Sequence, residues 1–445
     1  MVNDLKELMR QNVAAPPPDH LDVDALMGEG LRRVRRRQRR LIAIPAALVL
    51  GVLVTGQVVS SSNDSAKEIA GQPPRPDAPT ITLADATPAE EGRDYEVLTS
   101  YTNENLDADN GQYLDGVTDD GLILFRDGPR MNQRFPRYAL MDPETGDKDW
   151  LPKLVIGQSQ AWPVELGADR LVLASGDYSE NSDGMESKLV AHIFERSSRT
   201  WREQTWHGLP AVDFPGGAVA HDGRLYVKVP ATQGAIPEGG WPMGPDGEAE
   251  DADAEGDTFA LWSVSLTDAT DVRDEQLVLG DLAFTDSLMV WTDSSNGDAG
   301  RVHVRDLATG EEHSFDPNSG ERCNLLGFGA TDDRVVMSQY CGTYEDGVRD
   351  DRIQVVTTDG EQAFTLQGNS IEGLTNGDDV VTVTSYDRDA AGTYLYDLAT
   401  DRFVRLSDDV SQWAFGGLAG DDVFMWDTPE GRHGATQWVG RLLGG

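Results

Sequence analysis

The residues of this chain that could do chemistry are mostly carboxylates. One acidic loop, NLDADNGQY at residues 105–113, places Asp107 and Asp109 two positions apart, as alternate ligands of a Ca²⁺ loop are placed. Its glycine, Gly111, stands at the wrong offset for such a loop, and no Glu follows at the final ligand position. Asp107 and Asp109 therefore form a partial Ca²⁺ pattern, and we expect no other metal or cofactor.

No motif for a known catalytic mechanism is present in the sequence. It lacks G-x-S-x-G, H-E-x-x-H and C-x-x-C, and it has neither a phosphate-binding nor a dinucleotide-binding glycine loop. Its seven His are scattered without the spacing of metal ligands. We therefore expect a protein that is not an enzyme and has no catalytic residues. The alternative is a carbohydrate-active hydrolase or lyase that uses Asp or Glu side chains gathered by the fold.

One short phrase recurs seven times and indicates how the chain is built. In each copy an Asp follows a small or polar residue and precedes an apolar, often β-branched run, as in TDDGLILF (118–125). These marker aspartates are Asp120, Asp169, Asp222, Asp286, Asp333, Asp379 and Asp422. They are separated by 49, 53, 64, 47, 46 and 43 residues, which is the period of a four-stranded propeller blade.

The repeat predicts an all-β fold, a seven-bladed β-propeller over residues 93–445. Asp and Gly supply the turns between its strands. The last repeat ends at Gly445 without an outer strand, and RDYEVLTSY (93–101) would supply one and close the ring without a free edge. A pair of β-sandwiches is the alternative architecture. The longest separation between two marker aspartates, 64 residues, contains an acidic insertion at residues 245–257, which we expect to be solvated.

The two cysteines test this strand assignment. Cys323 and Cys341 flank the predicted hairpin CNLLGFGATDDRVVMSQYC, and their midpoint lies inside its ATDD turn. They should therefore lie opposite each other on the first two strands of the fifth blade. An oxidising compartment would let them form a disulfide. The alternative is a pair of reduced thiols in the core.

An uncharged apolar segment at residues 41–59 predicts a transmembrane helix. Its 19 residues would span about 28 Å, close to the thickness of a hydrocarbon core. Positive charge marks the cytoplasmic side, so the chain's N-terminus should lie inside and the propeller outside the plasma membrane. The residues that set this topology are Arg32, Arg33, Arg35, Arg36, Arg37, Arg39 and Arg40. A cleaved secretory or twin-arginine signal is the alternative.

The rest of the chain is strongly acidic. Residues 41–445 hold 71 acidic and 28 basic residues, so we expect no nucleic-acid partner and repulsion from anionic lipid. Residues 60–92 are rich in Ser, Pro, Ala and acid without an apolar period, which predicts a disordered extracytoplasmic linker. Usage rich in Arg, Ala, Gly and Asp, with six Lys, favours a high-GC bacterial source.

Residues 1–40 predict a short helical tail in the cytoplasm. Apolar residues recur there at helical spacing, and they are Leu5, Leu8, Met9, Leu21 and Leu26. Such short helices do not fold alone in water, but they could dock onto a cytosolic regulatory protein. The alternative is that the helices lie on the membrane and the Arg cluster only fixes topology.

The segment from Leu5 to Arg40, followed by one membrane span, resembles the N-terminus of actinobacterial single-pass proteins associated with extracytoplasmic-function sigma factors. The repeats resemble WD40-like or TolB-like propellers. The resemblance implies a signal passed from an outer propeller to a cytosolic sigma factor. The segment from Leu5 to Arg40 lacks the His-x-x-x-Cys-x-x-Cys pattern of zinc-binding anti-sigma domains.

Together these features predict a membrane-anchored extracytoplasmic propeller that binds or senses an unknown protein or carbohydrate ligand. The alternatives are the propeller enzyme described above and a sigma-factor regulator that acts through residues 1–40.

Overall fold

The computed structural model describes residues 78–443, with gaps at 108–110, 129–134, 157–159, 182–183, 244–248, 250, 253, 321–322, 344–348, 377–379 and 412–421. The expected cytoplasmic tail, its Arg cluster, the membrane span and most of the expected linker lie outside the described residues. Within them, no helix has the length and apolar character needed to cross a membrane.

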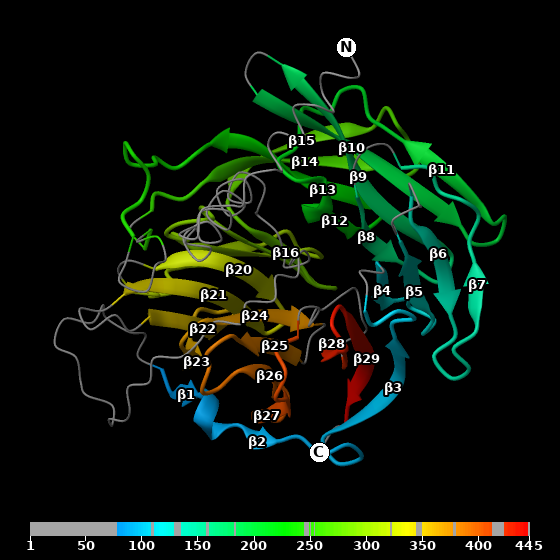
Figure 1. Cartoon of the computed structure of the whole chain (residues 1–445). Coiled ribbons are helices and arrows are strands. Elements are labelled where there is room, and N and C mark those ends of the chain that lie inside the picture. Colours follow the sequence, from blue (N-terminus) through cyan, green and yellow to red (C-terminus); the bar gives the residue numbers. More distant parts are fainter. Residues whose placement is uncertain are drawn as a thin grey trace, which may run out of the picture. The chain divides into compact units, whose positions relative to one another are not determined.

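Seven β-sheets make up the described chain, and each corresponds to one sequence repeat (Figure 1). Blade 1 contains β4 (Gln112–Val117), β5 (Ile123–Asp127), β6 (Arg137–Met141) and β7 (Lys148–Trp150). Blade 2 contains β8 (Ala161–Leu166), β9 (Arg170–Asn181), β10 (Gly184–Glu195) and β11 (Thr200–Gln204). Blade 3 contains β12 (Val219–His221), β13 (Arg224–Thr232), β14 (Thr258–Ser265) and β15 (Val272–Leu279), preceded by the 3-10 turn η2 (Pro215–Gly217).

The remaining blades follow the same antiparallel order. Blade 4 contains β16 (Leu282–Phe284), β17 (Leu288–Thr292), β18 (Val302–Asp306) and β19 (Glu312–Phe315). Blade 5 contains β20 (Asn324–Ala330), β21 (Arg334–Thr343), β22 (Arg349–Thr357) and β23 (Gln362–Gly368). Blade 6 contains β24 (Ile371–Asn376), β25 (Val380–Ser385), β26 (Gly392–Asp397) and β27 (Arg402–Ser407). Blade 7 contains β28 (Val423–Glu430), β29 (Gly434–Leu442) and β3 (Tyr95–Thr102), and the seven-bladed prediction is confirmed.

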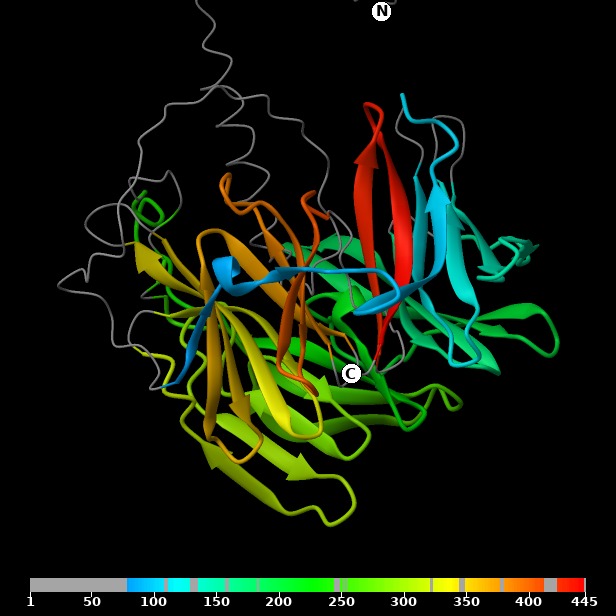
Figure 2. The same ribbon diagram turned by 90° about the horizontal axis from the view of Figure 1, so that it is seen from below.

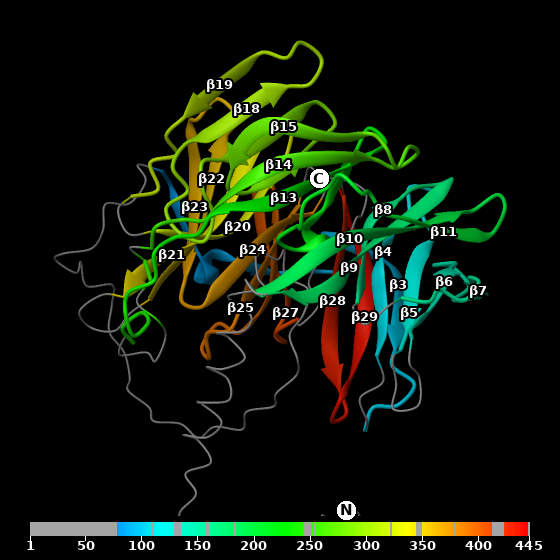
Figure 3. The ribbon, with the colours of Figure 1, turned by 90° about the horizontal axis from the view of Figure 1, so that it is seen from above.

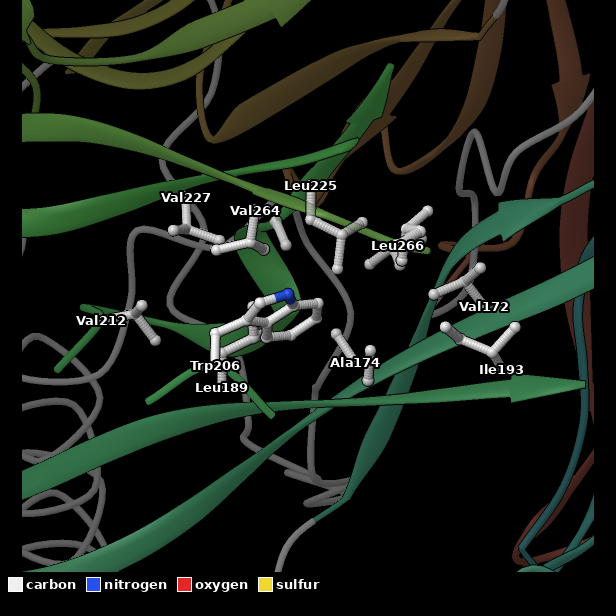
Figure 4. Close-up of a cluster of buried hydrophobic side chains, with 13 residues drawn as sticks. Val172, Ala174, Leu189, Ile193, Trp206, Val212, Leu225, Val227, Val264 and Leu266 are labelled. Carbon is white, nitrogen blue, oxygen red and sulfur yellow. The ribbon is translucent and has the colours of Figure 1, made fainter. Parts of the chain in front are cut away.

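Apolar clusters between neighbouring sheets join the blades into a ring. Each of seven buried clusters combines side chains of two adjacent blades, and one of them joins blade 7 to blade 1. Between blades 2 and 3, Trp206 lies among Ala174 and Leu189 on one side and Leu225 and Val264 on the other (Figure 4). Figure 3 shows these two blades from above. Because one blade cannot bury both of its faces, each depends on its neighbours for stability.

A strand from far upstream completes blade 7. β3 pairs antiparallel with β29, with Tyr95 opposite Leu442 and Thr102 opposite Thr436. The predicted closure by residues 93–101 is therefore confirmed. Pairing the two ends of the domain in one sheet leaves no open seam in the ring.

The residues before β3 extend the closure to two more blades. β1 (Thr80–Thr82) pairs parallel with β23, and β2 (Thr87–Pro88) pairs parallel with β27. The 3-10 turn η1 (Leu83–Asp85) joins β1 and β2, and its Leu83 packs on the core between blades 5 and 6. We call residues 78–94 the strap, and Figure 2 shows it crossing these blades on the outside.

The strap differs from the disordered linker expected over residues 60–92, in the part that the structure describes. An outer strand offers unpaired backbone groups that can pair with such a segment, and Ile81 and Leu83 add contacts to the core between blades 5 and 6. Composition alone therefore gave the wrong expectation for residues 78–92.

The two faces of the ring carry different connections. Turns between the first and second strands and between the third and fourth strands lie on one face, which we call the Asp-turn face. In some of these turns an Asp side chain bonds to the backbone of its own turn; for example, the Asp306 carboxylate accepts from the N–H groups of Ala308 and Thr309. The opposite face, which we call the loop face, carries the connections between the second and third strands and those between blades.

The disulfide prediction is confirmed. Cys323, directly before β20, is bonded to Cys341 on β21, with their Cα atoms 3.9 Å apart. The neighbouring pair in the register is Asn324 with Tyr340, so the two cysteines lie opposite each other on the first two strands of blade 5. Both are buried, at 6% and 1% exposed.

Candidate functional site

Three carboxylates gather around one amine on the loop face where blades 3 and 4 meet. Lys228 on β13 forms an ion pair with Asp281, 2.9 Å from Nζ to Oδ1, and both side chains are mostly buried. The backbone N–H of Asp213 donates to the Lys228 carbonyl at 2.9 Å. Asp257, at the end of the blade 3 insertion, lies close enough to Asp213 for its charge to affect the pKa of Asp213. We call Asp213, Asp257 and Asp281 the carboxylate cluster.

The electrostatics of the cluster are uneven. Burial raises the pKa of Asp213 above the ordinary 3.8, and the charges of Asp257 and Asp281 raise it further. The positive charge of Lys228 acts in the opposite direction on the pKa of Asp213. Lys228 itself lies over the Phe259 ring, 4.7 Å from its centroid. Three carboxylates beside one amine leave excess negative charge, which suits a cationic ligand or a proton transfer at Asp213.

The blade 3 insertion is held by blade 4 at its C-terminal end. The backbones of Asp257 and Ser295 exchange two hydrogen bonds, at 2.6 and 3.0 Å. The Asp257 carboxylate also accepts from Gly234 N at 2.8 Å and from Asn296 Nδ2 at 3.0 Å. Ala254 is 9% exposed. The expectation of a solvated insertion is therefore wrong for this end, because backbone pairing with blade 4 orders it.

The part of the β13–β14 connection that precedes the insertion presents apolar side chains to solvent. Ile236 is 71% exposed and Met243 is 49% exposed. The β13–β14 connection therefore carries exposed apolar side chains as well as Asp257 of the carboxylate cluster.

The predicted Ca²⁺ residues lie only partly within the described chain. Asp107 is exposed, and its backbone N–H donates to Asn105 Oδ1 at 3.0 Å, while Asp109 lies outside the described residues. Among the residues that the structure places, no group of three His, Cys, Asp or Glu is arranged to hold a metal. The predicted partner-binding and topology residues in the first 40 positions lie outside the described chain as well.

A second polar pair has the residue types of a nucleophile and its base. Ser175 Oγ and His192 Nε2 are 2.8 Å apart on β9 and β10. Burial lowers the pKa of His192, so the imidazole is neutral at pH 7. Both residues are only 3% exposed. A substrate cannot reach this pair without opening the blade, and we assign it a structural role.

Sequence reasoning missed the carboxylate cluster because its members carry no local motif. Asp213 lies between blades 2 and 3, Lys228 lies on a strand, Asp257 ends an insertion and Asp281 precedes blade 4. Only the ring geometry brings these four positions together. The long separation between the third and fourth marker aspartates was the one feature of the sequence that could have indicated the site, since it revealed the insertion.

Comparison with known proteins gives structural matches only. No protein-family model and no curated protein matches the chain. The β-propeller domain of the Trilobed protease from Pyrococcus furiosus is 11% identical, with a TM-score of 0.40, and the match covers 67% of this chain and 82% of that domain. An uncharacterized protein from Listeria monocytogenes is 9% identical over 75% of this chain and 87% of its own, with a TM-score of 0.37. Pyrococcus horikoshii acylaminoacyl peptidase is 13% identical, with a TM-score of 0.39, and the match covers 67% of this chain and 45% of the peptidase.

Proposed function

We propose that this chain is a single-pass, membrane-anchored extracytoplasmic propeller that binds or senses a ligand at its loop face without catalysis. The anchor in this proposal is the uncharged segment at residues 41–59, with the Arg cluster before it on the cytoplasmic side. The disulfide is consistent with an oxidising exterior. Residues 1–40 would carry the signal to a cytosolic regulatory protein.

The observation that carries the binding role is the carboxylate cluster of the loop face. The exposed Ile236 and Met243 lie on the same β13–β14 connection as Asp257 of this cluster. A ligand with cationic groups and apolar contacts fits this combination. The cluster therefore favours a protein partner over a neutral carbohydrate.

Site-specific photocrosslinking in intact cells tests this role against whatever ligand the cells supply. The full-length chain would carry p-benzoyl-phenylalanine in place of Ile236 on the loop face or, as a matched control, in place of the exposed Asp286 on the Asp-turn face. We expect a discrete adduct from the Ile236 position only. Equal adducts from both positions, or an adduct from Asp286 alone, would contradict binding at the loop face.

The raised pKa of Asp213 favours a second candidate function, an extracytoplasmic hydrolase acting on glycosides. Glycoside hydrolysis needs a carboxylic acid of raised pKa and a second carboxylate, and Asp281 and Asp257 lie in the same cluster. The purified full-length protein would then hydrolyse aryl glycosides, and Asp213→Asn would abolish that activity. Absence of hydrolysis, or hydrolysis that Asp213→Asn leaves unchanged, would reject this candidate.

A further inference from the structure

A pocket of about 470 Å³ opens on the Asp-turn face between blades 1 and 2, on the opposite face from the carboxylate cluster. Its floor is apolar and consists of Leu122 and Leu140 from blade 1 and Phe194 from blade 2. Leu140 and Phe194 belong to the buried core between these blades, so the floor is held by the same packing that joins them. The volume lies within the range of pockets that enclose a small ligand or a side chain.

Two Arg–Asp pairs brace the pocket from blade 2 to blade 1. Arg196 donates to both oxygens of Asp120, at 2.6 and 2.8 Å. Arg199 donates to both oxygens of Asp149, at 2.5 and 2.9 Å. Bidentate pairs of this kind fix geometry more firmly than single contacts. Both guanidinium groups are thereby engaged by carboxylates of this chain.

The remaining charges of the rim are unequal. The Lys148 ammonium lies over the rings of Tyr101 and Phe125, at 4.5 and 4.6 Å from their centroids. Asp142 uses its Oδ1 to accept from the backbone N–H groups of the β6–β7 turn. Asp147 is exposed and forms no ion pair within the described structure. The rim therefore presents two carboxylates above an apolar floor, with its three cations already engaged.

We propose that this pocket is a docking site for a lysine or arginine side chain of a partner polypeptide. The aliphatic stem of such a side chain would cover Leu122, Leu140 and Phe194, while its charged head would reach Asp142 and Asp147. Charge complementarity selects this occupant, because these two carboxylates of the rim have no cationic partner among the described residues. The site is separate from the ligand site of the loop face.

Fluorescence polarisation with the full-length protein in detergent tests the proposal. The probe is a labelled pentapeptide, Gly-Leu-Lys-Leu-Gly with blocked ends, and its matched control carries norleucine in place of Lys. The double variant Asp142→Asn, Asp147→Asn removes both charges, and Asn at 142 keeps the acceptor that the turn uses. The variant Asp286→Asn, Asp359→Asn, at exposed turns of blades 4 and 5, serves as the control with the same change in net charge.

We expect saturable binding of the Lys peptide and none of the norleucine peptide. Asp142→Asn with Asp147→Asn should weaken binding by about tenfold, as expected for two partly exposed charges. The Asp286, Asp359 control should bind as the parent does. Equal affinity in the parent and the Asp142, Asp147 variant would overturn the proposal, as would an equal loss in the control variant. Displacement of the peptide by free hexylamine at equal concentration would overturn the assignment to a polypeptide partner.

Discussion

Asp94 and Arg402 form an ion pair 3.2 Å long although 308 residues separate them in the sequence. Arg402 also donates to the carbonyl of Leu443 at 2.8 Å, and the Leu443 N–H donates to the Asp94 carbonyl at 3.0 Å. The strap, blade 6 and the C-terminal end of blade 7 therefore meet at one point. This contact holds both ends of the propeller in place.

Asp94→Ala should lower the free energy of unfolding by about 1–3 kcal/mol, because it leaves buried hydrogen-bonding groups without an acceptor. Asp94 is 5% exposed and also accepts from Glu90 N at 2.8 Å. Asp408→Ala is the matched control, since that carboxylate is 89% exposed and pairs only at the surface with Arg405. Chemical denaturation would measure the free energy of unfolding of both variants. An equal decrease in the two variants would contradict the role of Asp94.

The contribution of Asp94 should also depend on pH. Its hydrogen bonds with Arg93, and then with Glu90 N, hold the pKa of Asp94 below the ordinary 3.8. A carboxyl whose pKa is lower in the folded state stabilises the fold above its unfolded pKa, and this stabilisation disappears as the pH falls through the folded value. The stability difference between the parent and Asp94→Ala should therefore be constant near pH 7 and shrink below about pH 4. A difference that grows in acid would show the opposite linkage.

Removal of the disulfide should destabilise the protein by about 3 kcal/mol in the chain-entropy model. The bond closes a loop between residues 18 positions apart. The comparison is between the parent and Cys323→Ser with Cys341→Ser, measured by denaturation without reductant. Exported protein should also show no thiol that reacts with an alkylating reagent until it is unfolded and reduced. A reactive thiol in folded exported protein would contradict the pairing.

Asp350 and Arg352 form an ion pair whose side chains are both fully buried. Gln367 Nε2 donates to Asp350 at 2.7 Å, and Arg352 Nη1 donates to Ser319 O at 3.1 Å. Asp350→Ala should cost about 3–5 kcal/mol, because it leaves a buried guanidinium without its carboxylate. The double variant Asp350→Leu, Arg352→Met should recover most of that loss when unfolding is measured. A single variant as stable as the double one would show that the pair is not desolvated.

As the pH is lowered, binding at the loop face should begin to weaken at a higher pH than the ordinary pKa of an aspartate would predict. Burial raises the pKa of Asp213, so its negative charge is lost at a pH above 3.8. The affinity of the protein for a cationic ligand identified by crosslinking, measured at a series of pH values, should therefore fall as the pH decreases through this raised pKa. Asp213→Asn should remove that step, and a step that persists in this variant would assign it to another group.

The sequence predicted the repeat architecture well because blade strands are encoded locally. Each marker aspartate stands at a turn followed by an apolar run, and the spacing of these residues counts the blades directly. The cysteines were placed correctly for the same reason, since their midpoint falls in the ATDD turn. The upstream strand at residues 93–101 was found because blade 7 lacked an outer strand.

The strap and the carboxylate cluster depend on interactions that no local pattern shows. In residues 80–88 polar and apolar side chains alternate only over Thr80–Leu83, which is too short a pattern to predict a strand, and the segment pairs with the open edges of β23 and β27. Lys228 and Asp281 come together only when blades 3 and 4 have packed. Long-range charge clusters of this kind need the tertiary structure to be recognised.

The most direct test of the account is the crosslinked adduct of Ile236 with and without the carboxylate cluster. The full-length chain with p-benzoyl-phenylalanine at position 236 would be compared with the same chain carrying Asp213→Asn and Asp281→Asn, at equal expression and in intact cells. If the loop face binds its ligand through these carboxylates, the adduct is lost in the variant and kept when Asp286 and the exposed Asp359 are changed to Asn instead. An adduct of equal yield in all three proteins would contradict the proposed binding site.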